Sequence, residues 1–162
     1  MVHSNGLVFP EITDPVTNLK ILIVSTLWNS EVVDSLVQAT VQALLDEGVV
    51  KSQITCKTVP GSWELVAGIQ TSMAQDGYNV IVPIGCLIKG ETLHFEYISE
   101  AVARGLMDLQ IKSGIPILYG VLNCLDNKQA RCRAGLEPIG YNHGKDWGSG
   151  AVRMGLMHLK SQ

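Results

Sequence analysis

Charge is scarce in this sequence. Only 17% of its 162 residues are Asp, Glu, Lys or Arg, whereas a typical soluble domain has about 25%. The shortage has two interpretations: other subunits cover part of the outer surface, or a monomer has a large core. Because monomers seldom expose large apolar patches, we expect an oligomer. The length suits one domain.

Other scarcities exclude whole classes of partner. The net charge is −3 and no stretch is strongly basic, which argues against nucleic acid binding. No apolar run reaches the roughly 18–20 residues of a membrane span, and residues 1–6 lack the pattern of a secretory signal. The four cysteines form no C-x-x-C pair: Cys56, Cys86, Cys124 and Cys132. We expect reduced, mostly buried thiols in a cytoplasmic protein.

Common catalytic motifs are missing as well. The sequence contains no G-x-S-x-G, G-x-G-x-x-G or G-x-x-x-x-G-K-[ST], which argues against α/β-hydrolases and the common nucleotide-binding motifs. His94, His143 and His158 show neither H-x-x-x-H nor H-E-x-x-H spacing. We therefore predict no metal site.

What is present is a regular alternation of apolar strands and amphipathic helices. The patterns predict strands at residues 19–25, 53–59, 79–88 and 115–122, and helices at 30–47, 63–75, 93–112, 127–134 and 146–160. Asn29 or Ser30 can cap the first helix and Thr92 the third. This alternation predicts an α/β fold: a three-layer αβα sandwich with a four-stranded parallel sheet, helices on both faces and flavodoxin-like strand order. Residues 1–18 are predicted to be an N-terminal arm, and residues 19–162 a single domain.

Three strand-to-helix turns carry unusual residues. They are Leu27-Trp28-Asn29, Pro60-Gly61-Ser62-Trp63-Glu64-Leu65 and Lys89-Gly90-Glu91-Thr92-Leu93-His94. Parallel strands share a direction, so all three turns should emerge at the same sheet edge, where ligands bind in such folds. We expect the turns to converge on one site.

His94 is the sharpest catalytic candidate. It falls in the first turn of a predicted helix, beside free backbone N–H groups that suit an anion such as phosphate. The helix dipole disfavours an imidazolium ion, whereas a bound phosphate favours it, so this imidazole suits taking and returning a proton. The alternative is a plain surface histidine.

Four other residues have a functional and a structural interpretation. Trp28 either stacks on a heteroaromatic ring or packs under a loop. Glu64 either accepts hydrogen bonds from substrate hydroxyls or complements the helix dipole. Lys89 either forms a Schiff base or is a solvated loop residue. Arg133 either clamps a phosphate or lies on a solvated helix face.

Taken together and in order, these motifs resemble the lumazine synthase family. The resemblance covers residues 19–159. It rests on Trp28-Asn29, Val59 to Leu65, Gly85 to Tyr97, Pro116 to Leu122, Gln129-Ala130 with Arg133-Ala134-Gly135, and Asn142-His143-Gly144. It implies a condensation without a cofactor, in which 5-amino-6-ribitylaminouracil and 3,4-dihydroxy-2-butanone 4-phosphate form 6,7-dimethyl-8-ribityllumazine, the riboflavin precursor. An amine adds to the ketone to give an imine, phosphate is eliminated, and ring closure releases water.

The resemblance also implies roles for individual residues. His94 would transfer protons, and the substrates would be bound by Trp28, Asn29, Gly61, Ser62, Trp63, Glu64, Ile88, Tyr119 and His143. Phosphate would be held by Gly90, Glu91, Thr92 and Arg133. Sites of this family lie between neighbouring subunits of a pentamer, so Arg133 and Tyr119 would reach the site of the adjacent subunit.

Several positions depart from the family pattern. Tyr119 stands where phenylalanine is frequent, and Asn123 where threonine is frequent. His143 stands where many members have lysine. Trp28 replaces the commoner phenylalanine, as it does in fungal members. The larger indole predicts riboflavin binding. Residues 136–141 form a longer loop than in shell-forming members, which predicts a free pentamer.

Two other function classes compete with the enzyme. A non-catalytic flavin-binding protein on the same scaffold is the main alternative, against which the retained His94, Thr92 and Arg133 argue. A flavodoxin-type electron carrier would need a phosphate loop directly after the first strand, and Leu27-Trp28-Asn29 does not supply one.

Overall fold

One parallel sheet forms the centre of the molecule. The computed structural model describes residues 6–162. The strands pair in the order β2-β1-β3-β4, and they are β1 (Ile21–Thr26), β2 (Ile54–Val59), β3 (Val80–Ile88) and β4 (Gly120–Cys124). Ile21 pairs with Ile54 on one side and with Val80 on the other. The predicted α/β fold with flavodoxin-like strand order is therefore confirmed.

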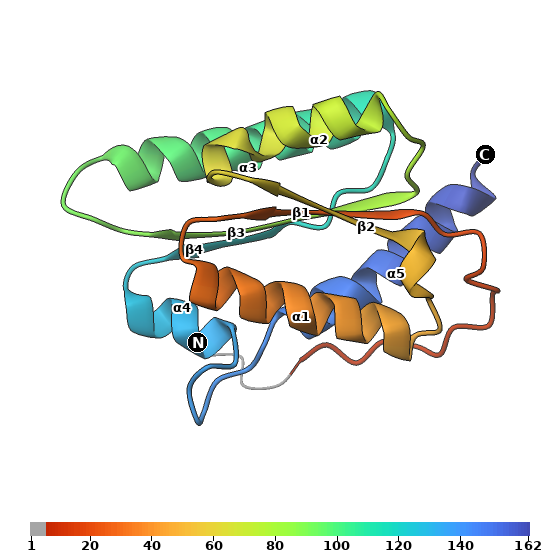
Figure 1. Ribbon diagram of the computed structural model, residues 1–162, viewed down its shortest axis with the longest axis horizontal. Coiled ribbons are helices and arrows are strands. Elements are labelled where there is room, and N and C mark those ends of the chain that lie inside the picture. The colour runs from red at the N-terminus through yellow and green to blue at the C-terminus, as the bar shows by residue number, and fades with distance from the viewer. Residues whose placement is uncertain (1–5) are drawn as a thin grey trace.

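Helices cover both faces of this sheet, as Figure 1 shows. One face carries α2 (Leu65–Met73) and α3 (His94–Ser113), and the other carries α1 (Ser30–Asp46), α4 (Asn127–Arg133) and α5 (Gly144–Lys160). Short 3₁₀ turns precede β2 (Lys51–Gln53) and α2 (Ser62–Glu64). Helix α5 packs tightly on α1 because Gly148 lacks a side chain: a Cβ there would lie 2.5 Å from the Thr40 carbonyl oxygen.

The apolar core lies on both faces of the two central strands. Alternate residues of β1, such as Leu22 and Val24, point to the side of α2 and α3, whereas Ile21 and Ile23 point to the side of α1 and α5. All four side chains are fully buried. Burial on both faces explains the near-continuous apolar runs from which these strands were predicted.

The fourth strand and the cap of the third long helix differ from the sequence prediction. The fourth strand was predicted at 115–122, but β4 is Gly120–Cys124, and Ile117 makes only an isolated bridge to Ile81. Pro116 has no N–H to donate to a ladder, so the apolar run there does not pair as a regular strand. The prediction that Thr92 caps α3 is also wrong: Leu93 holds the N-cap position, and the Thr92 hydroxyl only accepts a long 3.4 Å bond from the His94 N–H.

The described part of the predicted arm, residues 6–18, contains neither helix nor strand and lies along α5. Arg153 donates to the Pro10 carbonyl oxygen at 2.6 Å, and Lys160 pairs with Asp14 at 2.7 Å. None of the helices within residues 6–162 is long and apolar enough to cross a membrane.

Candidate active site

The three unusual turns meet at the carboxyl ends of β1, β2 and β3. A pocket of about 560 Å³ lies between them. Its lining comes from all three turns, the end of β3 and the start of α3: Trp28, Asn29, Gly61, Ser62, Trp63, Glu64, Cys86, Leu87, Ile88, His94 and Ile98. Eight of the predicted site residues therefore share one cavity.

The first turn presents an exposed indole. Trp28 is 73% exposed, so it does not pack under a loop. Asn29 adopts a left-handed conformation (φ 57°, ψ 44°), and its side-chain amide donates to the Cys86 carbonyl oxygen at 2.8 Å. As predicted, it holds the N-cap position of α1, but its side chain makes no cap bond. This amide instead fixes the turn to the end of β3.

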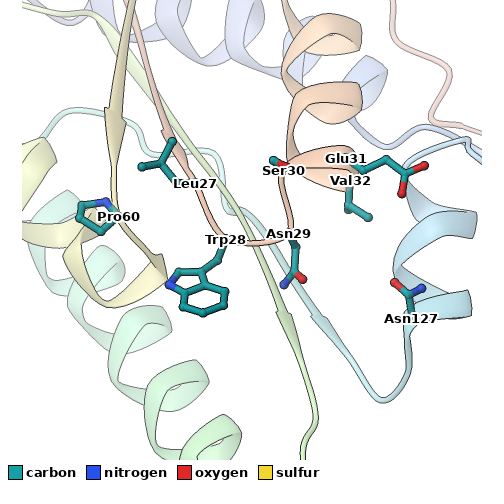
Figure 2. Close-up of a pocket in the computed structure, with 8 residues that line it drawn as sticks. All are labelled: Leu27, Trp28, Asn29, Ser30, Glu31, Val32, Pro60 and Asn127. Carbon is teal, nitrogen blue, oxygen red and sulfur yellow. The ribbon is translucent and has the colours of Figure 1, made fainter.

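Trp28 also borders a second opening, of about 550 Å³, on its other side. Figure 2 shows the indole close to Pro60, with Asn127 at the start of α4 on the far side of the opening. The backbone N–H of Trp28 donates to the Pro60 carbonyl oxygen at 3.3 Å. The ring therefore stands between two solvent-open cavities with a large part of its surface accessible to a planar ligand.

The second turn places a carboxylate at the pocket wall. Glu64 Oε2 accepts a 2.9 Å hydrogen bond from the Gly61 N–H, which holds the side chain back over its own turn. A Cβ on Gly61 would lie 3.2 Å from both this oxygen and Trp28 Cδ1, so glycine permits the close approach of the two turns. Trp63 is 60% exposed beside them. The Glu64 side chain thus stabilises its own turn and also lines the cavity.

The third turn leads into α3, which begins at His94 as predicted for the first helical turn. The His94 side chain is exposed and lines the pocket. Gly90, Glu91 and Thr92 are exposed next to the pocket but are not part of its lining. Lys89 Nζ pairs with Glu96 Oε1 at 2.6 Å, and this ammonium lowers the pKa of the Glu96 carboxyl. Lys89 is not part of the pocket lining, which disfavours it as a Schiff-base amine.

Three lining residues were missed from the sequence: Cys86, Leu87 and Ile98. Strand alternation from Ile88 places Cys86 on the same face, and helical spacing from His94 reaches Ile98, so both signals were available. The Cys86 thiol contacts the Cys124 thiol, and this contact together with burial raises its pKa. It therefore stays a neutral thiol near pH 7. All four cysteines are free, but only Cys86 and Cys124 are buried, so the prediction of mostly buried thiols is wrong.

Besides residues 90–92, three more predicted site residues lie outside this pocket within the single chain: Tyr119, Arg133 and His143. Arg133 ends α4, and its carbonyl oxygen accepts a 3.0 Å bond from the His143 N–H, which brings these two residues together. The Tyr119 hydroxyl accepts from the Asn123 amide at 2.8 Å. Within residues 6–162 no group of three or more His, Cys, Asp or Glu could hold a metal ion.

Known proteins share this sequence along nearly its whole length. The sequence model of the family described as 6,7-dimethyl-8-ribityllumazine synthase matches residues 18–158. A protein of that name from Schizosaccharomyces pombe is 49% identical over 87% of this chain and 89% of its own length. One from Pyricularia oryzae is 36% identical (85% and 87%), and one from Streptomyces coelicolor 34% identical (85% and 83%). The chain belongs to the 6,7-dimethyl-8-ribityllumazine synthase family.

Proposed function

We propose that the pocket between the three turns is the active site for the formation of 6,7-dimethyl-8-ribityllumazine. The substrates are 5-amino-6-ribitylaminouracil and 3,4-dihydroxy-2-butanone 4-phosphate. The observation that carries the proposal is the shared cavity: an exposed imidazole, an exposed indole and a carboxylate line one space at the carboxyl edge of a parallel sheet. No cofactor is required, because the substrates supply both nucleophile and electrophile.

His94 moves the protons that this condensation needs. The pyrimidine amine adds to the ketone, water leaves to form an imine, phosphate is eliminated, and ring closure releases a second water. Each step takes a proton from one atom and returns it to another, which suits an imidazole near neutral pH. Its position at the start of α3 places it between the pocket and the exposed backbone of residues 90–92.

The two substrates occupy different parts of the rim. The pyrimidine ring stacks on Trp28 and borders Asn29 and Ile88, all of which line the pocket. Its ribityl hydroxyls bond to Glu64 and to the turn around Ser62 and Trp63. The phosphate lies at Gly90, Glu91 and Thr92, which are exposed just before α3 begins and can offer backbone N–H groups to an anion.

A neighbouring copy completes the site. Arg133, Tyr119 and His143 lie outside the pocket of their own chain, and Arg133 is suited to pair with a phosphate held by another subunit. Helix α3 exposes Tyr97, Met107 and Ile111, each more than half accessible, which gives an apolar face that a second copy can cover. We infer a homopentamer, free rather than part of a shell because of the long 136–141 loop. Light scattering at the mass of a shell would contradict this assignment.

Purified protein mixed with both substrates tests the function directly. The absorbance of the lumazine product should appear, and His94→Ala should slow it by roughly ten- to a thousandfold. Flavin binding without turnover would instead support the non-catalytic alternative. We also propose that riboflavin binds at Trp28, and that the protein works in the cytoplasm, in keeping with its four free thiols.

A further inference from the structure

An ion pair bridges the short loop that joins β3 to α3. Lys89 follows the last residue of β3 and Glu96 is the third residue of α3, and their Nζ and Oε1 atoms lie 2.6 Å apart. The Lys89 backbone is fixed separately, because its N–H donates to the Cys124 carbonyl oxygen at 2.9 Å. The pair therefore links the anchored end of the sheet to the first turn of the helix.

The loop between these two residues has little to hold its shape. Residues 90–93 are all exposed, and a Cβ on Gly90 would meet nothing within 4 Å. The bond from the His94 N–H to the Thr92 hydroxyl is long, at 3.4 Å. A loop of this kind must be ordered before its N–H groups can bind an anion together, and ordering costs free energy at the moment of binding.

We propose that Lys89 and Glu96 are positioning residues whose ion pair holds residues 90–92 in the conformation that binds the phosphate of the four-carbon substrate. This inference rests on the proposed function. The pair acts by fixing the separation between the end of β3 and the start of α3, so the backbone donors are arranged before the ligand arrives.

Lys89 has a second conceivable role, as a direct ligand of the phosphate. The two roles predict opposite effects for Glu96→Gln. If Lys89 binds phosphate directly, loss of its carboxylate partner frees the ammonium and strengthens binding. If the pair holds the loop, the same loss weakens binding. The Lys89 side chain is 47% exposed and the Glu96 side chain 39%, so water screens the ion pair. The change in substrate binding on its loss should therefore be modest.

Steady-state kinetics with each substrate varied in turn separates these roles. We expect Glu96→Gln to raise the KM for the four-carbon phosphate by about two- to fivefold, with kcat and the KM for the pyrimidine within twofold of wild type. The charge-swapped variant Lys89→Glu/Glu96→Lys should recover most of the loss, because the attraction is restored with its sign reversed. Recovery is incomplete because a cation in the first helical turn is disfavoured.

Glu100→Gln is the matched control. Glu100 pairs with Arg104 at 3.0 Å on the same helix, but this pair does not span the loop, so its removal should leave both KM values unchanged. A lower KM in Glu96→Gln, an unchanged KM, or a swapped variant as poor as the single one would each overturn the inference. The proposed function fails separately: wild-type protein that forms no lumazine product from the two substrates would refute it, whatever the Glu96 variants do.

Discussion

Asn29 offers a sharp test of how the turn beneath Trp28 is held. It is the one non-glycine residue with positive φ between residues 6 and 162, and its amide bonds to a carbonyl oxygen 57 positions away in the sequence. Asn29→Ala removes the hydrogen bond, which costs about 1 kcal/mol. It also forces a Cβ-bearing residue without a local polar partner into the left-handed region, which costs about 1 kcal/mol relative to glycine.

The sum predicts a loss of about 2 kcal/mol in the free energy of unfolding for Asn29→Ala. For a chain of this size that corresponds to a fall in Tm of about 4–8 °C. Two variants separate the contributions. Asn29→Gly loses the bond but suits the backbone, so it should lose only about 1 kcal/mol. Asn29→Asp tolerates the left-handed region but cannot donate to a carbonyl oxygen, so it should also lose at least about 1 kcal/mol.

Urea unfolding at one fixed protein concentration is the appropriate assay, because the proposed assembly would make the apparent stability depend on concentration. Equal stability of the alanine and glycine variants would show that the backbone conformation carries no strain. Wild-type stability of Asn29→Asp would show that the amide bond to Cys86 contributes nothing.

Three further predictions concern other parts of the molecule. Burial and the bond to Asp146 raise the pKa of Tyr141 to about 12, so one of the four tyrosines should ionise late in an ultraviolet titration, and Tyr141→Phe should remove it. Because this folded-state pKa exceeds the unfolded value of about 10, the associated stability is complete below pH ~10 and is lost as the pH rises toward 12. Gly120→Ala would place a Cβ 2.5 Å from the Pro83 carbonyl oxygen and should destabilise the fold by about 1–3 kcal/mol in urea unfolding, whereas Gly77→Ala, which meets nothing within 4 Å, should be nearly neutral. Trp28→Ala should weaken riboflavin binding by about three- to tenfold in a fluorescence titration, more than Trp28→Phe does, and unchanged affinity would refute the stacking role.

The sequence was sufficient for the main architecture and for most of the pocket. Apolar runs located β1 and β3, and the turn residues after them predicted a convergent rim that the fold does form. These features are local: burial on both faces requires an unbroken apolar run, and a parallel sheet brings every strand-to-helix turn to the same edge. The position of His94 in the first turn of α3 followed from the same local pattern.

The predictions that failed involve choices that local pattern does not encode. Residues 115–119 are apolar but do not pair as a regular strand, since Pro116 lacks the donor that a ladder needs. Arg131 pairs with Glu31 and Glu137, which lie 100 and six positions away, so the pattern of its own helix does not reveal either partner.

By itself, then, the sequence determined the order of the strands and helices, which strands are buried on both faces, and which turns reach one edge of the sheet. Only the tertiary structure decided that Asn29 bonds to β3 and that Lys89 pairs with Glu96. The physical reason is the separation in sequence over which each interaction acts. Burial and capping depend on neighbours a few positions away, whereas hydrogen bonds and ion pairs depend on the distance between atoms that only folding brings together.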